Sequence, residues 1–169
     1  MKLQLASHRA SFVVAMAIVM LVAAPMTPVA RASSPVVLTA DLDGKMIDLT
    51  TVGTLHCHDF DYPRIHCFET ADALATAIAP TLAAAAINYV AVFDGTSYGG
   101  ASMFMTQDYS VLSLIGWNDR ISSFKGLNGQ AGTFYTDWFY GGSSWSFCCN
   151  QNVSSLGSFN DTFSSVRHS

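Results

Sequence analysis

The residues best suited to chemistry occur in two short loops with the same pattern. Residues 117–123 and 159–165 both read aromatic-Asn-Asp-x-x-Ser-Ser. Each loop offers a carboxylate, an amide, hydroxyls and backbone carbonyls, all of which are oxygen ligands. Ca²⁺ takes about six to eight oxygens of these kinds. The pattern therefore indicates a site for a hard divalent cation.

The two loops belong to a longer repeat with a constant spacing. The shift that places Tyr98-Gly99-Gly100 on Tyr140-Gly141-Gly142 also places the Asn-Asp pair of the first loop on that of the second, without an insertion. A repeat of this kind indicates one supersecondary unit used twice. We place motif one at 89–130 and motif two at 131–169.

Short β-prone runs in each motif predict the strands that must position the loops. In motif one these runs are 90–93, 101–106 and 122–127, and a turn at 94–97 precedes an aromatic corner. Gly100, which follows that corner, predicts a positive φ or a close approach of the backbone, because only glycine adopts both without steric cost. Four short strands per motif predict two Greek keys packed as a small sandwich.

The loops occur together with a second feature, an aromatic-x-x-x-x-aromatic-x-Gly corner at Phe93–Gly100 and again at Tyr135–Gly142. With both features in both repeats, the chain resembles the βγ-crystallin family over nearly all of 89–169. The resemblance implies a mainly β fold, a two-motif Greek-key βγ-crystallin-like sandwich.

The resemblance also implies up to two Ca²⁺ ions, since in this family two such loops lie side by side and exchange ligands. Each ion would take a carboxylate, the carbonyl that follows it and a hydroxyl from the other loop: Asp119, Arg120 and Ser164 for one ion, and Asp161, Thr162 and Ser122 for the other. The carbonyls of Asp94 and Thr136 match the family's remaining protein ligands, and Asn118 and Asn160 would order the loops.

One carboxylate per ion is a low ligand charge, so we expect dissociation constants of about 10⁻⁶ to 10⁻³ M, with water completing the shell. An alternative stays open for the same residues. Asn, Asp and Ser side chains also form turns without any ion, because they hydrogen-bond to the nearby backbone.

The start of the chain has the pattern of a secretory signal. Phe12–Ala24 is an uninterrupted apolar run that follows Lys2 and Arg9 and precedes Ala30-Arg31-Ala32. Crossing a bilayer takes about 20 apolar residues, so the run is too short to span one. We expect residues 1–32 to be removed after Ala32, which leaves a secreted, extracellular protein of a bacterial exporter with no membrane segment.

Cleavage would leave an acidic chain with five Lys and Arg against twelve Asp and Glu, a formal net charge of −7. Nucleic acid is a poor partner for such a chain, because phosphate binding depends on clustered Lys and Arg. Cations are better partners.

Residues 33–88 predict a small α+β N-terminal segment. Two β-prone runs flank the turn 41–44, and Thr70 can cap a helix that starts at Ala71 and runs toward Ile87, with a break at Pro80.

The four cysteines favour disulfides in an oxidising compartment. Cys57 and Cys67 flank a turn, so a cross-hairpin disulfide is the simplest interpretation, and zinc bound by His56, His58 and His66 is the less favoured one. Four cysteines allow three connectivities, so the partners of Cys148 and Cys149 stay open.

No motif brings a nucleophile, a base and an orienting acid together, so we do not expect an enzyme. The rival function is a secreted inhibitor of metalloproteinases, since such inhibitors resemble single crystallin-type domains. An inhibitor would present a rigid exposed loop to the protease cleft. Separately, Trp138 and Phe139 lie in a turn and would form a contact patch for a carbohydrate or a protein if they are exposed. A surface protein of a coat or adhesion layer is a third possible role.

Overall fold

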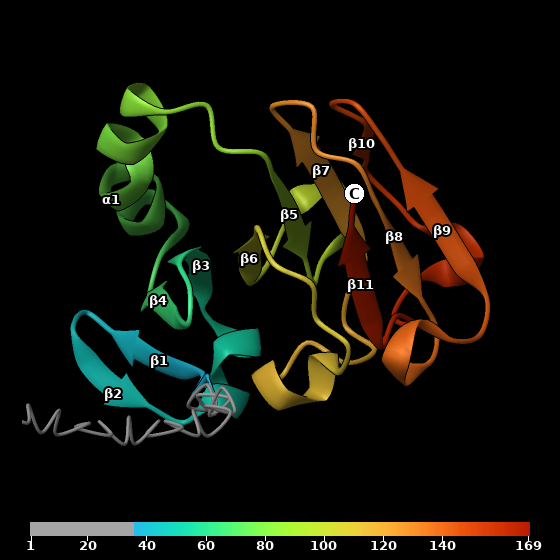
Figure 1. Cartoon of the computed structure of the whole chain (residues 1–169), viewed down its shortest axis with the longest axis horizontal. Helices are drawn as coiled ribbons and strands as arrows, with labels where there is room; N and C mark the ends of the chain where they lie inside the picture. The colour runs from blue at the N-terminus through green and yellow to red at the C-terminus, as the bar shows by residue number, and fades with distance from the viewer. Residues whose placement is uncertain (1–35) are drawn as a thin grey trace, which may run out of the picture. The chain divides into compact units, whose positions relative to one another are not determined.

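A computed structural model describes residues 36–169 (Figure 1). The predicted signal peptide, residues 1–32, lies outside the described residues. No helix in the described part of the chain is both long enough and apolar enough to cross a membrane.

The described chain is mainly β-structure, as predicted. Its strands are β1 (Thr39–Leu42), β2 (Lys45–Ile47), β3 (His56–Asp61), β4 (Arg64–Phe68), β5 (Tyr89–Phe93), β6 (Ser102–Met105), β7 (Ser123–Leu127), β8 (Gly132–Tyr135), β9 (Ser144–Phe147), β10 (Asn152–Val153) and β11 (Ser165–His168). The α-helix α1 spans Ala71–Ala84. Short 3-10 helices η1 (Leu49–Thr54), η2 (Thr96–Tyr98), η3 (Leu112–Ile115), η4 (Trp138–Tyr140) and η5 (Gly157–Phe159) connect several strands.

The strands form two sheets that exchange strands between the motifs. One sheet has the order β10-β7-β5-β6-β3-β4-β1-β2, and the other has the order β11-β8-β9. β10 of motif two pairs with β7 of motif one, and Tyr109 of motif one forms an antiparallel bridge to Val166 in β11 of motif two. Each motif therefore lends a segment to the other motif's sheet, which confirms the predicted pair of Greek keys.

Large aromatic side chains fill the space between the two sheets. Trp117, Phe124, Phe134 and Phe163 are fully buried. The Phe134 ring lies 5.2 Å from that of Phe124 and 5.1 Å from that of Phe163, measured between centroids. Burying one such side chain contributes about 1.5–3 kcal/mol. Since Trp117 and Phe163 belong to the two Asn-Asp loops, their burial in this core anchors both loops.

Residues 36–88 have the predicted α+β composition, and their strands extend the sheet of motif one. β3 pairs in parallel with β6, with Cys57 opposite Met103. β1 pairs in parallel with β4 and antiparallel with β2. The hairpin is therefore present as predicted, but its turn is shorter than the predicted 41–44, because β1 continues to Leu42. Figure 1 shows these strands and α1 on one side of the motif-one strands.

The predicted break of the helix at Pro80 is wrong. Thr70 caps α1 as expected, with its hydroxyl accepting a hydrogen bond from Ala73 N at 3.2 Å, but the helix continues through Pro80 to Ala84. Proline removes the hydrogen bond to the carbonyl four residues earlier. Both Pro80 and Thr76 are exposed, so water can satisfy the carbonyl that proline leaves free.

The cysteines form two disulfides. Cys57 pairs with Cys67 across β3 and β4, which confirms the favoured interpretation. Cys148 pairs with its neighbour Cys149 in the connection between β9 and β10. The described residues therefore contain no free cysteine.

Candidate metal centre

Each Asn-Asp loop folds into a bend that holds its aspartate in place. Asp119 and Asp161 have positive φ values of 53° and 54°, a conformation that Asp and Asn adopt more readily than most residues. Asn118 Nδ2 donates to Asp119 Oδ2 at 2.6 Å, and Asn160 Nδ2 donates to Asp161 Oδ2 at 2.6 Å. The asparagines therefore order the carboxylates, and one oxygen of each carboxylate stays available.

The available oxygen of each carboxylate faces a hydroxyl from the other repeat. Ser122 Oγ donates to Asp161 Oδ1 at 2.9 Å, and Ser164 Oγ lies 3.4 Å from Asp119 Oδ1. Backbone bonds join the loops as well: Asp119 N donates to the Phe163 carbonyl at 2.9 Å, and Asp161 N donates to the Ile121 carbonyl at 3.1 Å. The structure thus brings together the two carboxylate–hydroxyl pairs that the sequence predicted to be close.

The corner of each motif lies against the serine of the same motif. Ser122 N donates to the Phe93 carbonyl at 2.9 Å, and Ser164 N donates to the Tyr135 carbonyl at 2.8 Å. Asp94, the next residue after Phe93, is therefore at the Asp161–Ser122 pair. Thr136, which follows Tyr135, occupies the same place at the Asp119–Ser164 pair.

Gly100 makes this corner possible. Its φ is +74°, and a Cβ at this position would overlap with Asp94 Oδ1. Gly142 has the same φ in motif two, where a Cβ would overlap with Thr136 Oγ1. The positive φ and close approach predicted for Gly100 are both present.

Four backbone carbonyls at the two pairs are available for a ligand. Within residues 36–169, no backbone or side-chain hydrogen bond ends on the carbonyl oxygen of Asp94, Arg120, Thr136 or Thr162. Nearby carbonyls are used, since Ser123 Oγ donates to Gly95 O and Ser165 Oγ donates to Asp137 O. Backbone carbonyls are strong acceptors that need a partner, so these four have room for water or a cation.

The donor set suits a hard cation. Carboxylate, hydroxyl and carbonyl oxygens are the ligands that Ca²⁺ prefers. Clusters of three or more His, Cys, Asp or Glu side chains able to hold a metal do not occur in the described residues, which agrees with one carboxylate at each pair.

The less favoured zinc interpretation is not supported by this geometry. Cys57 is in a disulfide, and His56 Nδ1 lies 3.0 Å from Ser102 Oγ. His66 pairs instead with Asp41, 2.9 Å from its Nδ1. Among the described residues, no group of three or more His, Cys, Asp or Glu side chains is arranged to hold a metal ion.

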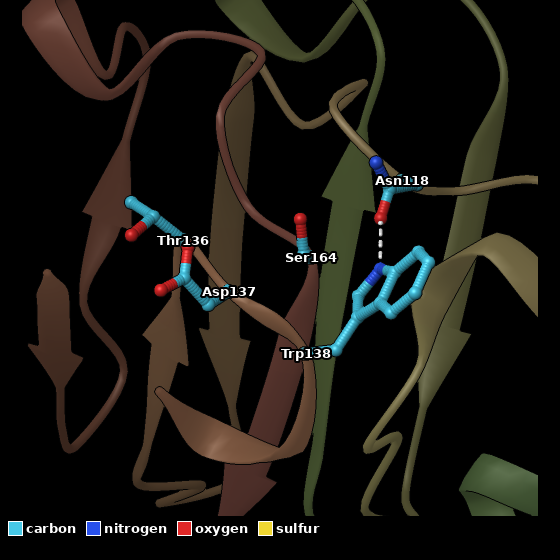
Figure 2. Close-up of a pocket in the computed structure, with 5 residues that line it drawn as sticks. All are labelled: Asn118, Thr136, Asp137, Trp138 and Ser164. Atoms are coloured by element: carbon cyan, nitrogen blue, oxygen red, sulfur yellow. Dashed lines mark hydrogen bonds between the residues drawn. The ribbon is translucent and has the colours of Figure 1, made fainter. Parts of the chain in front are cut away.

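The two pairs have different neighbours. At the Asp119–Ser164 pair, Trp138 Nε1 donates to Asn118 Oδ1 at 2.9 Å. Figure 2 shows this bond beside a pocket lined also by Thr136, Asp137 and Ser164. Trp138 and Phe139 are 53% and 71% exposed, so the predicted aromatic patch is present.

At the Asp161–Ser122 pair, Arg120 Nη2 forms an ion pair with Asp94 Oδ2 at 2.9 Å. A small pocket here is lined by Asp94, Asp119, Arg120 and Asp161. The sequence did not predict this ion pair, and the register of the repeat shows only that the two positions differ between the motifs. That register aligns Asp94 and Arg120 with Thr136 and Thr162, so only motif one carries a charged pair at these positions.

Of the comparisons with known proteins, the one with solved structures finds similar domains. No family model and no curated protein matches the sequence. Among solved structures, a βγ-crystallin domain from Flavobacterium johnsoniae is 32% identical, and the match covers 47% of this chain and 92% of that chain with a TM-score of 0.42. A βγ-crystallin from an archaeon is 30% identical over 48% of this chain and 98% of that chain, with a TM-score of 0.43.

Identity of this level extends over almost the full length of both relatives, and this chain has two motifs with paired Asn-Asp loops. The chain belongs to the βγ-crystallin family. A βγ-crystallin from Ciona intestinalis is also similar, with 24% identity over 48% of this chain and 99% of that chain and a TM-score of 0.45. The part of this chain that matches the two relatives with at least 30% identity is about half of its length.

Proposed function

We propose that the βγ-crystallin domain binds up to two Ca²⁺ ions and that the ions stabilise it. One ion would be held by Asp119, the carbonyls of Arg120 and Thr136, and Ser164. The other would be held by Asp161, the carbonyls of Asp94 and Thr162, and Ser122. The observation that carries this proposal is the set of four carbonyls without hydrogen bonds beside two carboxylate–hydroxyl pairs.

Calcium would act by replacing a bond within each pair. Ser122 and Asp161 are 2.9 Å apart, so their oxygens already converge and little ordering is needed when an ion arrives. An ion that binds only the folded state adds about 2.7 kcal/mol of stability at one hundred times its dissociation constant. For a chain of this size, that corresponds to a rise in Tm of roughly 10 °C.

A thermal melt with calcium and with chelator tests the proposal. The wild-type protein should melt roughly 10 °C higher at a calcium concentration one hundred times the dissociation constant, and Asp119→Ala combined with Asp161→Ala should remove most of that shift. Asp72→Ala is the matched control, because Asp72 is an exposed carboxylate in the first turn of α1. Coincident melting curves for the wild type in calcium and in chelator would return the loops to a purely turn-forming role.

Inhibition of a metalloproteinase is the second candidate function, and the exposed loop of Trp138 and Phe139 favours it. Phe139 has a positive φ of 55°, and its N–H donates to the Ser110 carbonyl at 2.8 Å. The loop is therefore held by the backbone while its aromatic rings face solvent, which suits a preorganised binding loop. A panel of thermolysin-type enzymes should be inhibited by the wild type and not by Phe139→Ala if this candidate is correct.

We further propose that the protein is exported and processed after Ala32. The signal-like composition of residues 1–32 and the two disulfides support export to an oxidising compartment. Expression in a bacterial host with a functioning secretion pathway, followed by mass spectrometry of the exported chain, should find Ser33 at the N-terminus. An exported or cell-retained chain that keeps residues 1–32 would contradict this.

A further inference from the structure

The ion pair between Arg120 and Asp94 lies at one of the two proposed calcium positions. Asp94 follows Phe93, whose carbonyl accepts the Ser122 N–H, so the guanidinium lies at the corner that belongs to the Asp161–Ser122 pair. Both side chains of the ion pair are half-buried, with exposures of 37% for Arg120 and 25% for Asp94. Arg120 and Asp94 line the same small pocket as Asp161 and Asp119.

A positive charge at this position opposes a second cation. The ion pair places a guanidinium nitrogen 2.9 Å from the carboxylate of the residue whose carbonyl is a proposed ligand. Like charges at distances of a few ångströms repel each other even across a surface exposed to water. A calcium ion could therefore enter the Asp161–Ser122 pair only as the guanidinium moves away.

The bond that holds Arg120 is weak enough to break. Arg120 makes one charge-assisted contact, through Nη2, and its Nε is buried without a hydrogen-bond partner among the described residues. A guanidinium with an unsatisfied donor is stabilised less by its ion pair than a guanidinium that forms two hydrogen bonds to a carboxylate. Partly exposed ion pairs also contribute little to stability.

Motif two does not repeat this arrangement. Thr136 and Thr162 stand where motif one has Asp94 and Arg120. The Thr162 hydroxyl donates to the Phe159 carbonyl at 2.8 Å, and the Thr136 hydroxyl accepts from Ser143 N at 2.9 Å. Both threonines are thus bound locally and bring no charge to the Asp119–Ser164 pair.

We infer that Arg120 is a built-in competitor of calcium at the Asp161–Ser122 position, an inference that rests on the proposed calcium binding. The Asp119–Ser164 position fills first, and the Asp161–Ser122 position fills only at higher calcium concentration, when the ion displaces the guanidinium. The domain then responds to calcium in two steps instead of one.

Calorimetric titration of the exported chain with calcium chloride, with Arg120→Thr as the key variant, tests this inference. The substitution gives motif one the residue of motif two at the equivalent position. The wild type should bind calcium in two steps, and Arg120→Thr should strengthen the weaker step about tenfold. Ser122→Ala should remove the weaker binding step both in the wild type and in Arg120→Thr. Ser164→Ala should remove the tighter binding step.

Arg167→Thr is the control for the change in net charge. Arg167 is exposed and lies over the Tyr140 ring, 5.5 Å from its centroid, and it takes no part in either pair. The control variant should leave both steps within about twofold of the wild type, because water and salt screen an exposed charge.

The outcomes separate this inference from the proposed function. Two steps that Arg120→Thr does not change, or a gain shared equally by Arg167→Thr, would overturn the role of Arg120 and leave calcium binding intact. Loss of the tighter step in Ser122→Ala would also overturn it, because the order of filling would be reversed. No calcium heat and no change in the melting temperature for any variant would overturn both.

Discussion

Asp59 connects the N-terminal segment to the βγ-crystallin domain, and its removal should destabilise the whole unit. This carboxylate near the end of β3 is fully buried. It accepts hydrogen bonds from Thr106 N at 2.7 Å, Thr106 Oγ1 at 2.8 Å and Tyr109 Oη at 2.9 Å. Tyr109 belongs to the segment that motif one lends to β11. The Asp59 side chain thus joins β3 to the segment that follows β6 and, through Tyr109, to β11.

The cost of removing the carboxylate follows from the donors that it leaves. Asp59→Ala leaves the buried Tyr109 hydroxyl without an acceptor. It also removes the acceptor of two Thr106 donors, but Thr106 is only partly buried, so water can replace that acceptor. A buried unsatisfied donor costs about 1–3 kcal/mol, and each bond to a charged group contributes about 1.5–3 kcal/mol. Allowing for water at Thr106, we expect Asp59→Ala to lower the free energy of unfolding by about 3 kcal/mol.

Asp59→Asn separates the charge from the hydrogen bonds. Burial raises the pKa of the Asp59 carboxyl, and the hydrogen bonds from Thr106 and Tyr109 oppose that rise. Asparagine keeps an oxygen for the two Thr106 bonds and avoids burying a charge. Its loss should therefore be about 1–2 kcal/mol, smaller than that of alanine.

Urea unfolding followed by tryptophan fluorescence, to which the fully buried Trp117 contributes, measures both changes. The midpoint should fall in the order wild type, Asp59→Asn, Asp59→Ala, with an unchanged slope, since the native surface is the same. The exposed Asp72→Ala serves as the reference. A loss below about 1 kcal/mol in the free energy of unfolding for Asp59→Ala would refute the reasoning. A buried carboxylate that accepts three hydrogen bonds should contribute more than that.

Three further predictions concern the site and the fold. Gly100→Ala should cost more stability than Gly129→Ala in urea unfolding, since both have a positive φ but only the Cβ at Gly100 overlaps another residue; equal losses would mean that the contact with Asp94 is unimportant. Lowering the pH from about 6.5 to 4 should reduce stability, because burial and the neighbouring His66 lower the pKa of His58 to about 4 in the folded protein and the unfolded state then binds the extra proton. Replacing His58 by Asn should flatten that part of the stability–pH curve measured by urea unfolding, and an unchanged slope would assign it to other groups. Cys57→Ser combined with Cys67→Ser should lower the free energy of unfolding by about 2–4 kcal/mol, and reductant should then have a smaller effect on the double variant than on the wild type.

The pattern of residues along the chain was enough to predict two equivalent β units over residues 89–169, because the repeat keeps its register from Tyr98 and Tyr140 to the Asn-Asp loops without an insertion. The partners within each carboxylate–hydroxyl pair came from the resemblance to the βγ-crystallin family, and the structure places those partners together. Local chemistry also predicted a positive φ or a close approach of the backbone at Gly100, since only glycine adopts either without steric cost, and the structure has both.

The remaining features depend on contacts between segments that are distant in the sequence. The parallel pairing of β3 with β6 depends on which sheet edge is free, and no local pattern records this. The continuation of α1 through Pro80 depends on the exposure of the Thr76 carbonyl. The Arg120–Asp94 ion pair forms because the fold places a long flexible side chain of one loop within reach of the neighbouring corner, and the reach of such a side chain is set by three-dimensional distance rather than by spacing along the chain.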